Sequence, residues 1–276
     1  MCVTSNSPDL WIDRLPTVDE NTNKYTRGHA VIFGGYPMTG AARLAARACA
    51  RTGAGLTTIF VEHRALDVYA KHLESIMVRA VTDHSNLESA LDDPRITSIL
   101  AGPGLGVSSR TKGIVRACLV TGHPVVLDAD ALTSFADAPN ELFALLHREC
   151  VITPHEGEFS RIFSLTGSRE ERATEASRRC GAVVLLKGSR TVVAAPMGEL
   201  VVNPPASPHL ATAGSGDVLA GIITGLLAQG MSPFDAACAG VWVHSEVGRH
   251  LGIGMIADDM PEDIPRVRRL LVNEPK

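Results

Sequence analysis

In residues 211–221, two glycines, Gly214 and Gly216, come just before one carboxylate at the start of an apolar helix. Gly214 and Gly216 allow a tight turn, so the first free N–H groups of that helix can face a bound anion, for which phosphate is the natural candidate. A carboxylate is unfavourable beside phosphate, and Asp217 is therefore a candidate base that accepts a proton from a substrate hydroxyl. The alternative is that Asp217 is an N-cap and the glycines serve only the turn. The spacing alone leaves both interpretations open.

Two glycine-rich loops, residues 34–42 and 101–106, each follow a predicted strand and run into a helix. Ligands of open parallel sheets bind outside the carboxyl ends of the strands, so both loops could admit a ligand against their backbone. Close packing of helix on sheet explains the same small residues. The second loop lacks the full G-x-G-x-x-G pattern with an acidic residue about twenty positions on, which makes a nicotinamide-binding Rossmann domain the weaker interpretation.

Two further strand ends carry ionisable side chains. His155 and Glu158 follow a buried strand, where His155 could hydrogen-bond a ligand and Glu158 could order a hydrated Mg²⁺ beside phosphates. A capping role for His155, and compensation of the helix dipole by Glu156 and Glu158, are the alternatives. Lys187 ends an apolar strand at the same edge, and snorkelling to water is its plain alternative. The four loops together favour a ligand site more than any one of them does.

Length, charge and cysteine pattern narrow the class of protein. With 276 residues, 45% of them hydrophobic, the chain can bury a large core, and we expect one domain over residues 1–276. A net charge of -4 without a basic run gives no general attraction to nucleic acid or membrane. The six scattered cysteines, without C-x-x-C or an apolar leader, predict reduced thiols in a cytoplasmic protein. No H-E-x-x-H, G-x-S-x-G or Walker A motif is present.

Short β-branched runs alternate with Ala-rich or amphipathic stretches, which predicts an α/β fold with a mostly parallel sheet and helices on both faces. The predicted strands are His29–Gly35, Leu56–Val61, Ile96–Ala101, Val125–Asp128, Cys150–Thr153 and Ala182–Lys187, followed by an edge hairpin of Thr191–Ala195 and Glu199–Asn203. The predicted helices are Gly40–Thr52, Ser108–Val120, Glu156–Thr166, Arg169–Arg179, Asp217–Gln229 and Pro233–Gly252. We expect the segment up to about Asn23 and the residues after Leu271 to be peripheral.

These segments, in this order, resemble the ADP-dependent NAD(P)H-hydrate dehydratase family, a branch of the ribokinase-like superfamily. The resemblance covers about residues 23–269, and the ordered set of motifs is far more specific than any one of them. It implies a ribokinase-like three-layer sandwich. The matching segments are 24–29 with Gly34-Gly35, 38–42, 51–56, 101–106, 127–132, 153–158, 186–188 and 213–217.

The resemblance implies a role for each matching residue. Asp217 would be the catalytic base, and Gly214, Ser215 and Gly216 would form the anion hole. Glu158 would help to organise Mg²⁺ through water. The residues implied to contact the hydrated nicotinamide nucleotide are Ala41, Gly104, His155 and Asp217, and those implied along the nucleotide ADP or AMP are Lys187, Gly188, Ser189, Arg190 and Thr191.

The implied reaction repairs NADHX and NADPHX, in which water has added across a nicotinamide double bond, with ADP as phosphoryl donor. This family's domain often travels with an epimerase domain, for which this chain has no room, so we expect a separate epimerase as functional partner. The resemblance also suggests a homo-oligomer, a tetramer. The alternatives are a ribokinase-like small-molecule kinase of the hydroxymethylpyrimidine or hydroxyethylthiazole type, against which His155 and the opening at residues 24–29 argue, and a catalytically idle nucleotide-binding module.

Two positions depart from the pattern of the family. Glu156 stands where proline is usual, and residues 206–210 replace a glycine-rich approach to the anion hole. Neither departure removes a proposed catalytic group. Both bear on the shape of the nucleotide edge, and the choice between ADP and ATP is inherited from the resemblance.

Overall fold

The computed structural model describes residues 3–81 and 84–272, and their ten strands form one sheet in the order β1-β10-β9-β8-β7-β6-β5-β2-β3-β4. Neighbouring strands from β4 to β8 are parallel, whereas β9 is antiparallel to both β8 and β10. The strands are β1 (Thr4–Ser5), β2 (His29–Phe33), β3 (Leu56–Val61), β4 (Met77–Ala80), β5 (Ile96–Ala101), β6 (Val125–Leu127), β7 (Cys150–Ile152), β8 (Val183–Leu186), β9 (Val192–Ala194) and β10 (Leu200–Val202).

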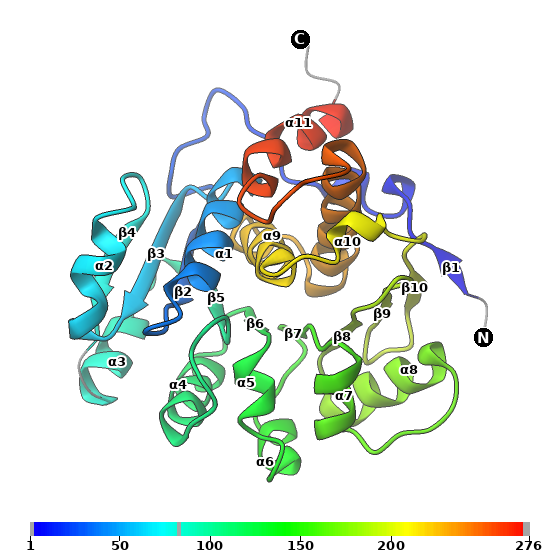
Figure 1. The fold of residues 1–276 in the computed structure, drawn as a ribbon, viewed down its shortest axis with the longest axis horizontal. Helices are drawn as coiled ribbons and strands as arrows, with labels where there is room; N and C mark the ends of the chain where they lie inside the picture. Colours follow the sequence, from blue (N-terminus) through cyan, green and yellow to red (C-terminus); the bar gives the residue numbers. More distant parts are fainter. Residues whose placement is uncertain (1–2, 82–83, 273–276) are drawn as a thin grey trace.

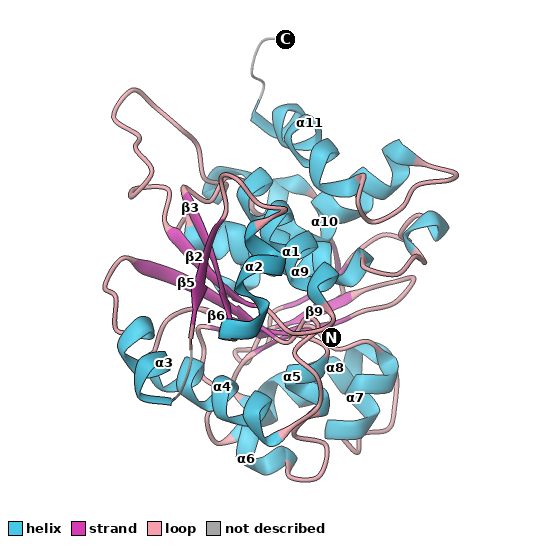
Figure 2. Cartoon of the chain, turned by 60° about the vertical axis from the view of Figure 1, so that its left-hand side comes forward, coloured by secondary structure: helices cyan, strands magenta, loops and turns pink. Residues whose placement is uncertain are grey.

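Helices cover both faces of the sheet, so that the molecule has three layers (Figure 1). In this view α1, α9, α10 and α11 lie above the sheet and α4 to α8 lie below it, and Figure 2 shows the same separation from the side. The helices are α1 (Thr39–Thr52), α2 (Leu66–Ala70), α3 (His84–Leu91), α4 (Ser109–Val120), α5 (Asp130–Thr133), α6 (Pro139–Phe143), α7 (Glu156–Ile162), α8 (Arg169–Cys180), α9 (Ser215–Ala228), α10 (Pro233–Leu251) and α11 (Met260–Val272).

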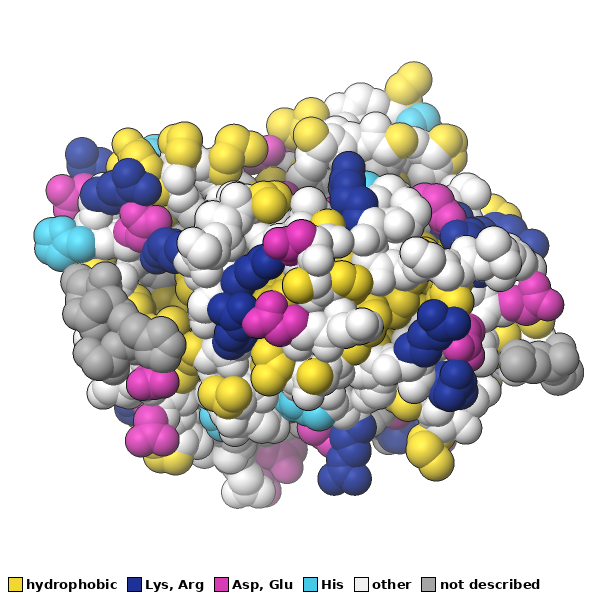
Figure 3. Space-filling view, turned by 90° about the horizontal axis from the view of Figure 1, so that it is seen from below, with side chains coloured by type: hydrophobic (Ala, Val, Ile, Leu, Met, Phe, Trp, Pro, Cys, Tyr) yellow, Lys and Arg dark blue, Asp and Glu magenta, His cyan; other side chains and the backbone are white. Residues whose placement is uncertain are grey.

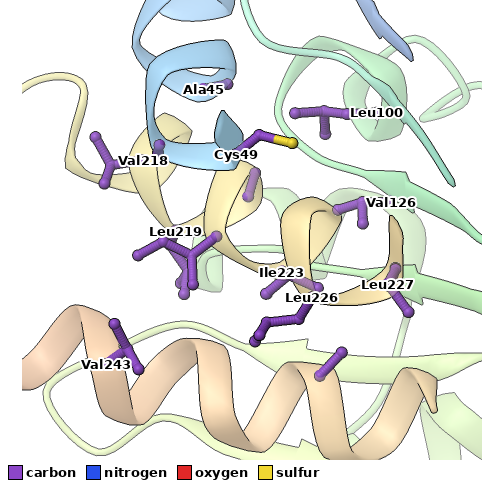
Figure 4. Close-up of a cluster of buried hydrophobic side chains, with 14 of the residues drawn as sticks. Ala45, Cys49, Leu100, Val126, Val218, Leu219, Ile223, Leu226, Leu227 and Val243 are labelled. Atoms are coloured by element: carbon purple, nitrogen blue, oxygen red, sulfur yellow. The ribbon is translucent and has the colours of Figure 1, made fainter. Parts of the chain in front are cut away.

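The helix α9 lies in the core between α1 and α10, as Figure 4 shows. Nearly all of its residues from Val218 onward are buried, because α9 meets the sheet and both neighbouring helices. At two glycines of α9 its backbone packs closely against the backbone of α1. A Cβ atom on Gly221 would lie 2.2 Å from the carbonyl oxygen of Ala45, and one on Gly225 would lie 2.7 Å from that of Cys49. The two glycines therefore set the distance between these helices.

All six predicted parallel strands and all six predicted helices are confirmed, with ends that differ by a few residues. The helix predicted from Asp217 begins at Ser215, so the glycine turn itself forms the first helical residues. The predicted hairpin is present as β9 and β10. Its edge position was wrong, because β1 pairs with β10 and forms the last strand on that side.

The expectation that the segment up to Asn23 is peripheral was wrong for residues 4–15. Trp11 is 1% exposed and its ring meets Trp242 of α10 edge to face, at 5.8 Å between centroids. The Asn6 side-chain amide donates to Asn203 Oδ1 and to the carbonyl oxygen of Cys238, both at 2.8 Å. Burial of one large aromatic ring and a paired amide anchors this segment despite its polar composition. Of the residues after Leu271, also expected to be peripheral, Val272 ends α11 and residues 273–276 lie outside the described part of the chain.

The lower helical layer presents basic and acidic side chains side by side (Figure 3). Ion pairs such as Lys112–Asp137 and Arg178–Glu175 account for part of this mixture. The described cysteines, Cys49, Cys118, Cys150, Cys180 and Cys238, are free and buried, whereas Cys2 lies outside the described residues. None of the helices in the described ranges is long and apolar enough to cross a membrane.

Candidate active site

The carboxyl ends of β6, β7 and β8 bring three chemically active residues to one edge of the sheet. Asp128 follows β6, His155 lies three positions after the end of β7, and Lys187 follows β8. The Lys187 amide donates to the carbonyl oxygen of Pro154 at 2.9 Å, which extends the parallel pairing of β7 and β8 beyond the strands. The amino end of α9 arrives at the same edge, so a carboxylate, an imidazole, an ammonium and a helix N-terminus converge there.

The Lys187 ammonium is the centre of this cluster. Its Nζ lies 2.7 Å from Asp128 Oδ1 and 4.0 Å from Glu158 Oε2. Burial would lower the pKa of Lys187, but the charges of Asp128 and Glu158 outweigh it and raise that pKa above its ordinary value. A Cβ atom on Gly216 would lie 3.4 Å from the same Nζ. The ammonium therefore stays charged and stands directly beside the first turn of α9.

Asp128 and Asp130 are separated by a residue in an unusual backbone conformation. Ala129 has φ 48° and ψ -117°, which non-glycine residues adopt at a cost of roughly 1–3 kcal/mol. This turn directs the Asp128 carboxylate to Lys187, while Asp130 Oδ2 accepts a hydrogen bond of 2.8 Å from the amide of Gly106. The strained turn thus ties the loops after β5 and β6 together while both carboxylates keep a partner.

Asp217, in the first turn of α9, has a strongly perturbed acidity. Burial raises its pKa to about 7, and the negative charge of Asp128 adds to this effect although Lys187 opposes it. A carboxyl group with a pKa near neutrality can take up a proton at physiological pH and give it back. Among the alternatives that the sequence left open for Asp217, this acidity favours the base over a plain N-cap, and Asp217 makes no capping hydrogen bond at Gly214.

His155 and Glu158 form a capping box at the start of α7. His155 Nδ1 accepts hydrogen bonds from the amides of Gly157 at 2.9 Å and Glu158 at 3.2 Å, and Glu158 Oε2 accepts one of 2.8 Å from the amide of His155. A neutral His155 must therefore carry its proton on Nε2. Burial, with the charge of Asp128 in the same direction, raises the pKa of Glu158. The capping role of His155 is therefore present in the structure, and Nε2 on the half-exposed ring lies 3.4 Å from Glu158 Oε1.

A cleft of about 660 Å³ runs from His155 and Lys187 along the amino end of α9 toward α10. One wall is the loop after β8 and the other is the segment after β10, joined by the hydrogen bond from the amide of Ala206 to the carbonyl oxygen of Ser189, at 3.0 Å. The floor is formed by α9 and α10. The lining residues are His155, Lys187, Gly188, Ser189, Thr191, Ala206, Ser207, Pro208, Leu210, Ala211, Thr212, Ser215, Gly216, Leu219, Val241, His244 and Ser245.

Not every residue implied for the nucleotide lies in this cleft. Lys187, Gly188, Ser189, Thr191, Ser215 and Gly216 line it, whereas Arg190 is exposed to solvent outside its lining. Gly214 is also outside the lining and serves as the N-cap of α9 with φ 89°.

The residues implied for the hydrated nicotinamide fall into two places. His155 lines the cleft. Asp217 lies in the first turn of α9, next to Gly216, which is a lining residue. Ala41 lies in the first turn of α1, and a Cβ atom on Gly104 would be 3.4 Å from the Cβ of Ala41. Ala41 and Gly104 are thus neighbours that join the glycine-rich loops after β2 and β5.

Glu156, which stands where proline is usual, has a structural role. It occupies the first helical position of α7, which also suits proline, and it pairs with Arg169 and Arg172 of α8. Arg169 in turn donates to the carbonyl oxygen of Lys187 at 2.7 Å. The departure therefore braces the loop after β8 from outside the cleft. The segment 206–210 lines the cleft itself and contains a short 3₁₀ helix, Pro208–Leu210.

Two residues of the site were missed by the sequence interpretation. Asp128 was noted within a motif but given no role, although it holds Lys187. His244 lies in the middle of α10, outside every motif considered, and lines the cleft beside Ser215. A lone histidine in an apolar helix gives no signal of its own. For Asp128, a carboxylate at the end of an apolar strand was the available signal.

The fold and the site define an α/β protein of the ribokinase-like fold. The crystal structure of a ribokinase-like superfamily protein from Enterococcus faecalis matches with a TM-score of 0.87 and 25% identity, covering 98% of this chain and 96% of that chain. Residues 29–266 match the model of the NAD(P)H-hydrate dehydratase family. The chain therefore belongs to the NAD(P)H-hydrate dehydratase family.

Two NAD(P)H-hydrate dehydratases show how similar the chain is to other members of the family. The ADP-dependent (S)-NAD(P)H-hydrate dehydratase of Neisseria meningitidis is 38% identical over 82% of this chain and 77% of its own length. The ADP/ATP-dependent NAD(P)H-hydrate dehydratase of Bacillus subtilis, co-crystallized with ATP and Mg²⁺, is 26% identical with a TM-score of 0.84, covering 98% of this chain and 99% of that chain. The chain spans about half the length of the bifunctional NAD(P)H-hydrate repair enzymes that it matches, for example 53% of that of Moorella thermoacetica.

Proposed function

We propose that residues 1–276 act as one domain that dehydrates NADHX and NADPHX back to NADH and NADPH, with ADP as phosphoryl donor. The observation that carries this proposal is the position of Asp217. It lies in the first turn of α9, in the same cluster as the charged Lys187, and its pKa of about 7 suits a base. A base beside an anion-binding helix terminus fits transfer of a phosphoryl group to a substrate hydroxyl.

In this proposal the ADP phosphates lie at the amino end of α9, where the amides of Ser215 and Gly216 and the ammonium of Lys187 face them. The remainder of ADP lies in the cleft along Gly188, Ser189 and Thr191, with Arg190 at its outer margin. The nicotinamide ring lies beside Asp217, between His155 and the neighbouring pair Ala41 and Gly104. These assignments place the hydroxyl of the hydrated ring between the base and the terminal phosphoryl group.

The reaction then has two steps that balance. Asp217 takes the proton of the ring hydroxyl, the oxygen forms a bond to the terminal phosphorus of ADP, and the bond to AMP breaks with its electron pair on AMP. The ring carbon–oxygen bond next breaks with its electrons on phosphate, and a proton leaves the neighbouring ring carbon as the double bond forms. Phosphorylation thus replaces hydroxide, a poor leaving group, by phosphate. Each well-placed backbone donor supplies roughly 3 kcal/mol toward the charged transition state.

The acidic residues around Lys187 fit a hydrated Mg²⁺. Asp128, Asp130, Glu158 and Asp217 contribute four carboxylates against one ammonium, so ADP phosphates need a further cation there. Within residues 3–81 and 84–272, no group of three or more His, Cys, Asp or Glu could hold a metal directly, and Mg²⁺ tends to keep several waters. Glu158 would hold the ion through water. When bound, Mg²⁺ supplies neutralisation of the phosphate charge.

The test is to incubate the purified protein with NADHX, Mg²⁺ and either ADP or ATP, and to follow the return of the absorbance of reduced nicotinamide together with AMP and phosphate. The matched control is Asp217→Asn, which keeps shape but not basicity. Recovery with ADP in the wild type, lost in the variant, supports the proposal. Recovery with ATP alone would still support the dehydration reaction but would show that ADP is not the phosphoryl donor. Binding of nucleotide without recovery points to the idle module, and a phosphorylated product from another hydroxyl compound points to the small-molecule kinase.

A separate NAD(P)H-hydrate epimerase is the proposed functional partner, because it would convert the epimer that this protein does not use. Adding such an epimerase to an epimeric mixture of NADHX should raise the final recovery of NADH from part of the substrate to nearly all of it. The assay without epimerase is the control. Complete recovery without it would remove the need for that partner.

A further inference from the structure

His244, in the middle of α10, meets the first residue of α9 in two ways. Its Nε2 lies 2.9 Å from the carbonyl oxygen of Ser215 and 3.0 Å from Ser215 Oγ. Both residues are buried, at 7% and 5% exposure, and both line the cleft. His244 lies outside the motifs of the sequence and has no role in the reaction proposed above.

The hydrogen-bond inventory of this pair decides which atom carries each proton. A carbonyl oxygen can only accept, so the contact of 2.9 Å requires a proton on Nε2 of His244. An Nδ1–H tautomer would place two lone pairs against each other at that distance. The Ser215 hydroxyl faces the same Nε2–H and therefore accepts from it in a shared hydrogen bond. The hydroxyl proton of Ser215 must then point away from His244.

We propose that His244 is a positioning residue for nucleotide binding, because it fixes the Ser215 hydroxyl as a hydrogen-bond donor toward the phosphate oxygens at the start of α9. This proposal rests on the proposed function for the identity of the anion. Ser215 lines the cleft next to Gly216, on which a Cβ atom would lie 3.4 Å from Lys187 Nζ, so a donor from Ser215 Oγ joins the same anion site. His244 itself does not touch the reacting atoms.

The environment of His244 keeps this arrangement intact across pH. Burial lowers its pKa to about 4, and the charge of Lys187 acts in the same direction, so the ring is neutral near pH 7 with one proton to give. With that proton held by the backbone of α9, the ring cannot become an acceptor for Ser215. The Ser215 hydroxyl therefore does not donate a hydrogen bond to His244, and its proton remains available to a ligand in the cleft.

The first test is the tautomer of His244 in the wild-type protein, read from the nitrogen chemical shifts of ¹⁵N-labelled histidine and assigned by loss of the signal in His244→Gln. An Nε2–H tautomer is expected. An Nδ1–H tautomer would overturn the proposal, because Ser215 would then be free to donate to the ring. This measurement needs no catalytic turnover, and the tautomer itself is read from the wild-type protein.

The second test measures the Kd for ADP with Mg²⁺ in the absence of hydrated nicotinamide, so that it does not depend on the dehydration reaction. Ser215→Ala is expected to weaken ADP roughly ten- to hundredfold, as loss of a hydrogen bond to a charged group does. His244→Leu should lose a large part of the same factor, whereas His244→Gln, whose amide N–H can reach the position of Nε2, should recover most of it. Unchanged affinity in His244→Leu, with its fold intact by thermal melting, would overturn the proposal.

A double-mutant cycle separates positioning from mere packing. If His244 acts through the Ser215 hydroxyl, His244→Leu should cost much less affinity in the Ser215→Ala background than in the wild type. Equal costs in the two backgrounds would show that His244 acts independently of that hydroxyl. If ADP binds and the cycle shows coupling but NADHX is not repaired, the inference stands for a nucleotide site and the proposed function fails.

Discussion

Lys187 Nζ and Asp128 Oδ1 lie 2.7 Å apart at the carboxyl end of the sheet, and Asp128 is only 2% exposed. The ion pair fixes the ammonium at the site where α9 begins, so the positive charge is in place before a phosphate arrives. It also places a buried negative charge near Asp217. The pKa of the proposed base, which burial raises most, is therefore raised further by the charge of a residue that follows β6.

The rate of repair should depend on pH through Asp217. Because the pKa of about 7 means that half of the groups are protonated at that pH, kcat/KM should fall about tenfold for each unit below it and level off above it. The measurement is the pH profile of kcat/KM for NADHX at saturating ADP. A profile that is flat from pH 5 to pH 8, in a protein that remains folded, would contradict the role of Asp217.

The same residue should reduce stability at high pH. Its pKa in the folded protein lies above the unfolded value of 3.8, so the folded state binds more protons between these values and its stability falls as pH rises through about 4 to 7. Asp217→Asn removes this effect and should raise the free energy of unfolding at pH 8 by about 1 kcal/mol, or Tm by roughly 2–4 °C. Thermal melting at pH 8 and at pH 4 tests this, because the gain should vanish at pH 4.

Asp128→Asn should move the acidic limb of the pH profile to lower pH, because the charge of Asp128 raises the pKa of Asp217. Lys187→Met should have the opposite effect. Because the charge of Lys187 lowers the pKa of Asp217, its loss should move the acidic limb of the profile to higher pH. Pairs of pH profiles for kcat/KM reveal both shifts. Equal shifts in one direction would show that the variants act on packing and not on the charge at Asp217.

His155 can be divided into its two roles. His155→Ala removes the cap of α7 and should lower the free energy of unfolding by about 1 kcal/mol, whereas His155→Asn keeps a good N-cap and should change it little. Both variants remove Nε2, so both should lower kcat/KM for NADHX. Urea unfolding together with kinetics distinguishes the roles, and an Asn variant with wild-type kinetics would leave His155 as a cap alone.

Gly216 and Gly214 should respond differently to alanine. Gly216→Ala is sterically tolerable, because its Cβ would lie 3.4 Å from the flexible end of Lys187 and 4.0 Å from Asp128 Oδ2. The added methyl group occupies space in the anion site and should weaken ADP binding about tenfold or more, with little change in Tm. Gly214→Ala should destabilise the fold, since Gly214 has φ 89° and a Cβ would lie 2.7 Å from Leu44 Cδ1. Calorimetry and thermal melting of the two variants compare these effects. Equal loss of Tm in both would contradict the assignment of Gly216 to an open anion site.

The strands that are buried on both faces could be predicted from the sequence, because continuous apolar runs that alternate with helices fit few arrangements other than a parallel sheet. It missed β4, whose four residues alternate between exposed and half-buried positions, and α11, which contains Pro265. In the site, residues that follow strands could be predicted to converge. His244 could not, because its importance arises only when α10 packs against the start of α9 and brings two sequence-distant residues into contact.

The contact of α1 with α9 through Gly221 and Gly225 also limits how the enzyme can move. The two helices carry Ala41 and Asp217, which the proposed reaction places on either side of one ring, and at Gly221 and Gly225 their backbones are in close contact. If the proposed function holds, movement during turnover must come from the surrounding loops, because the close contact of α1 with α9 keeps the proposed base at a fixed distance from Ala41. Gly225→Ala, although far from the proposed nucleotide site, would push α1 and α9 apart and should lower kcat.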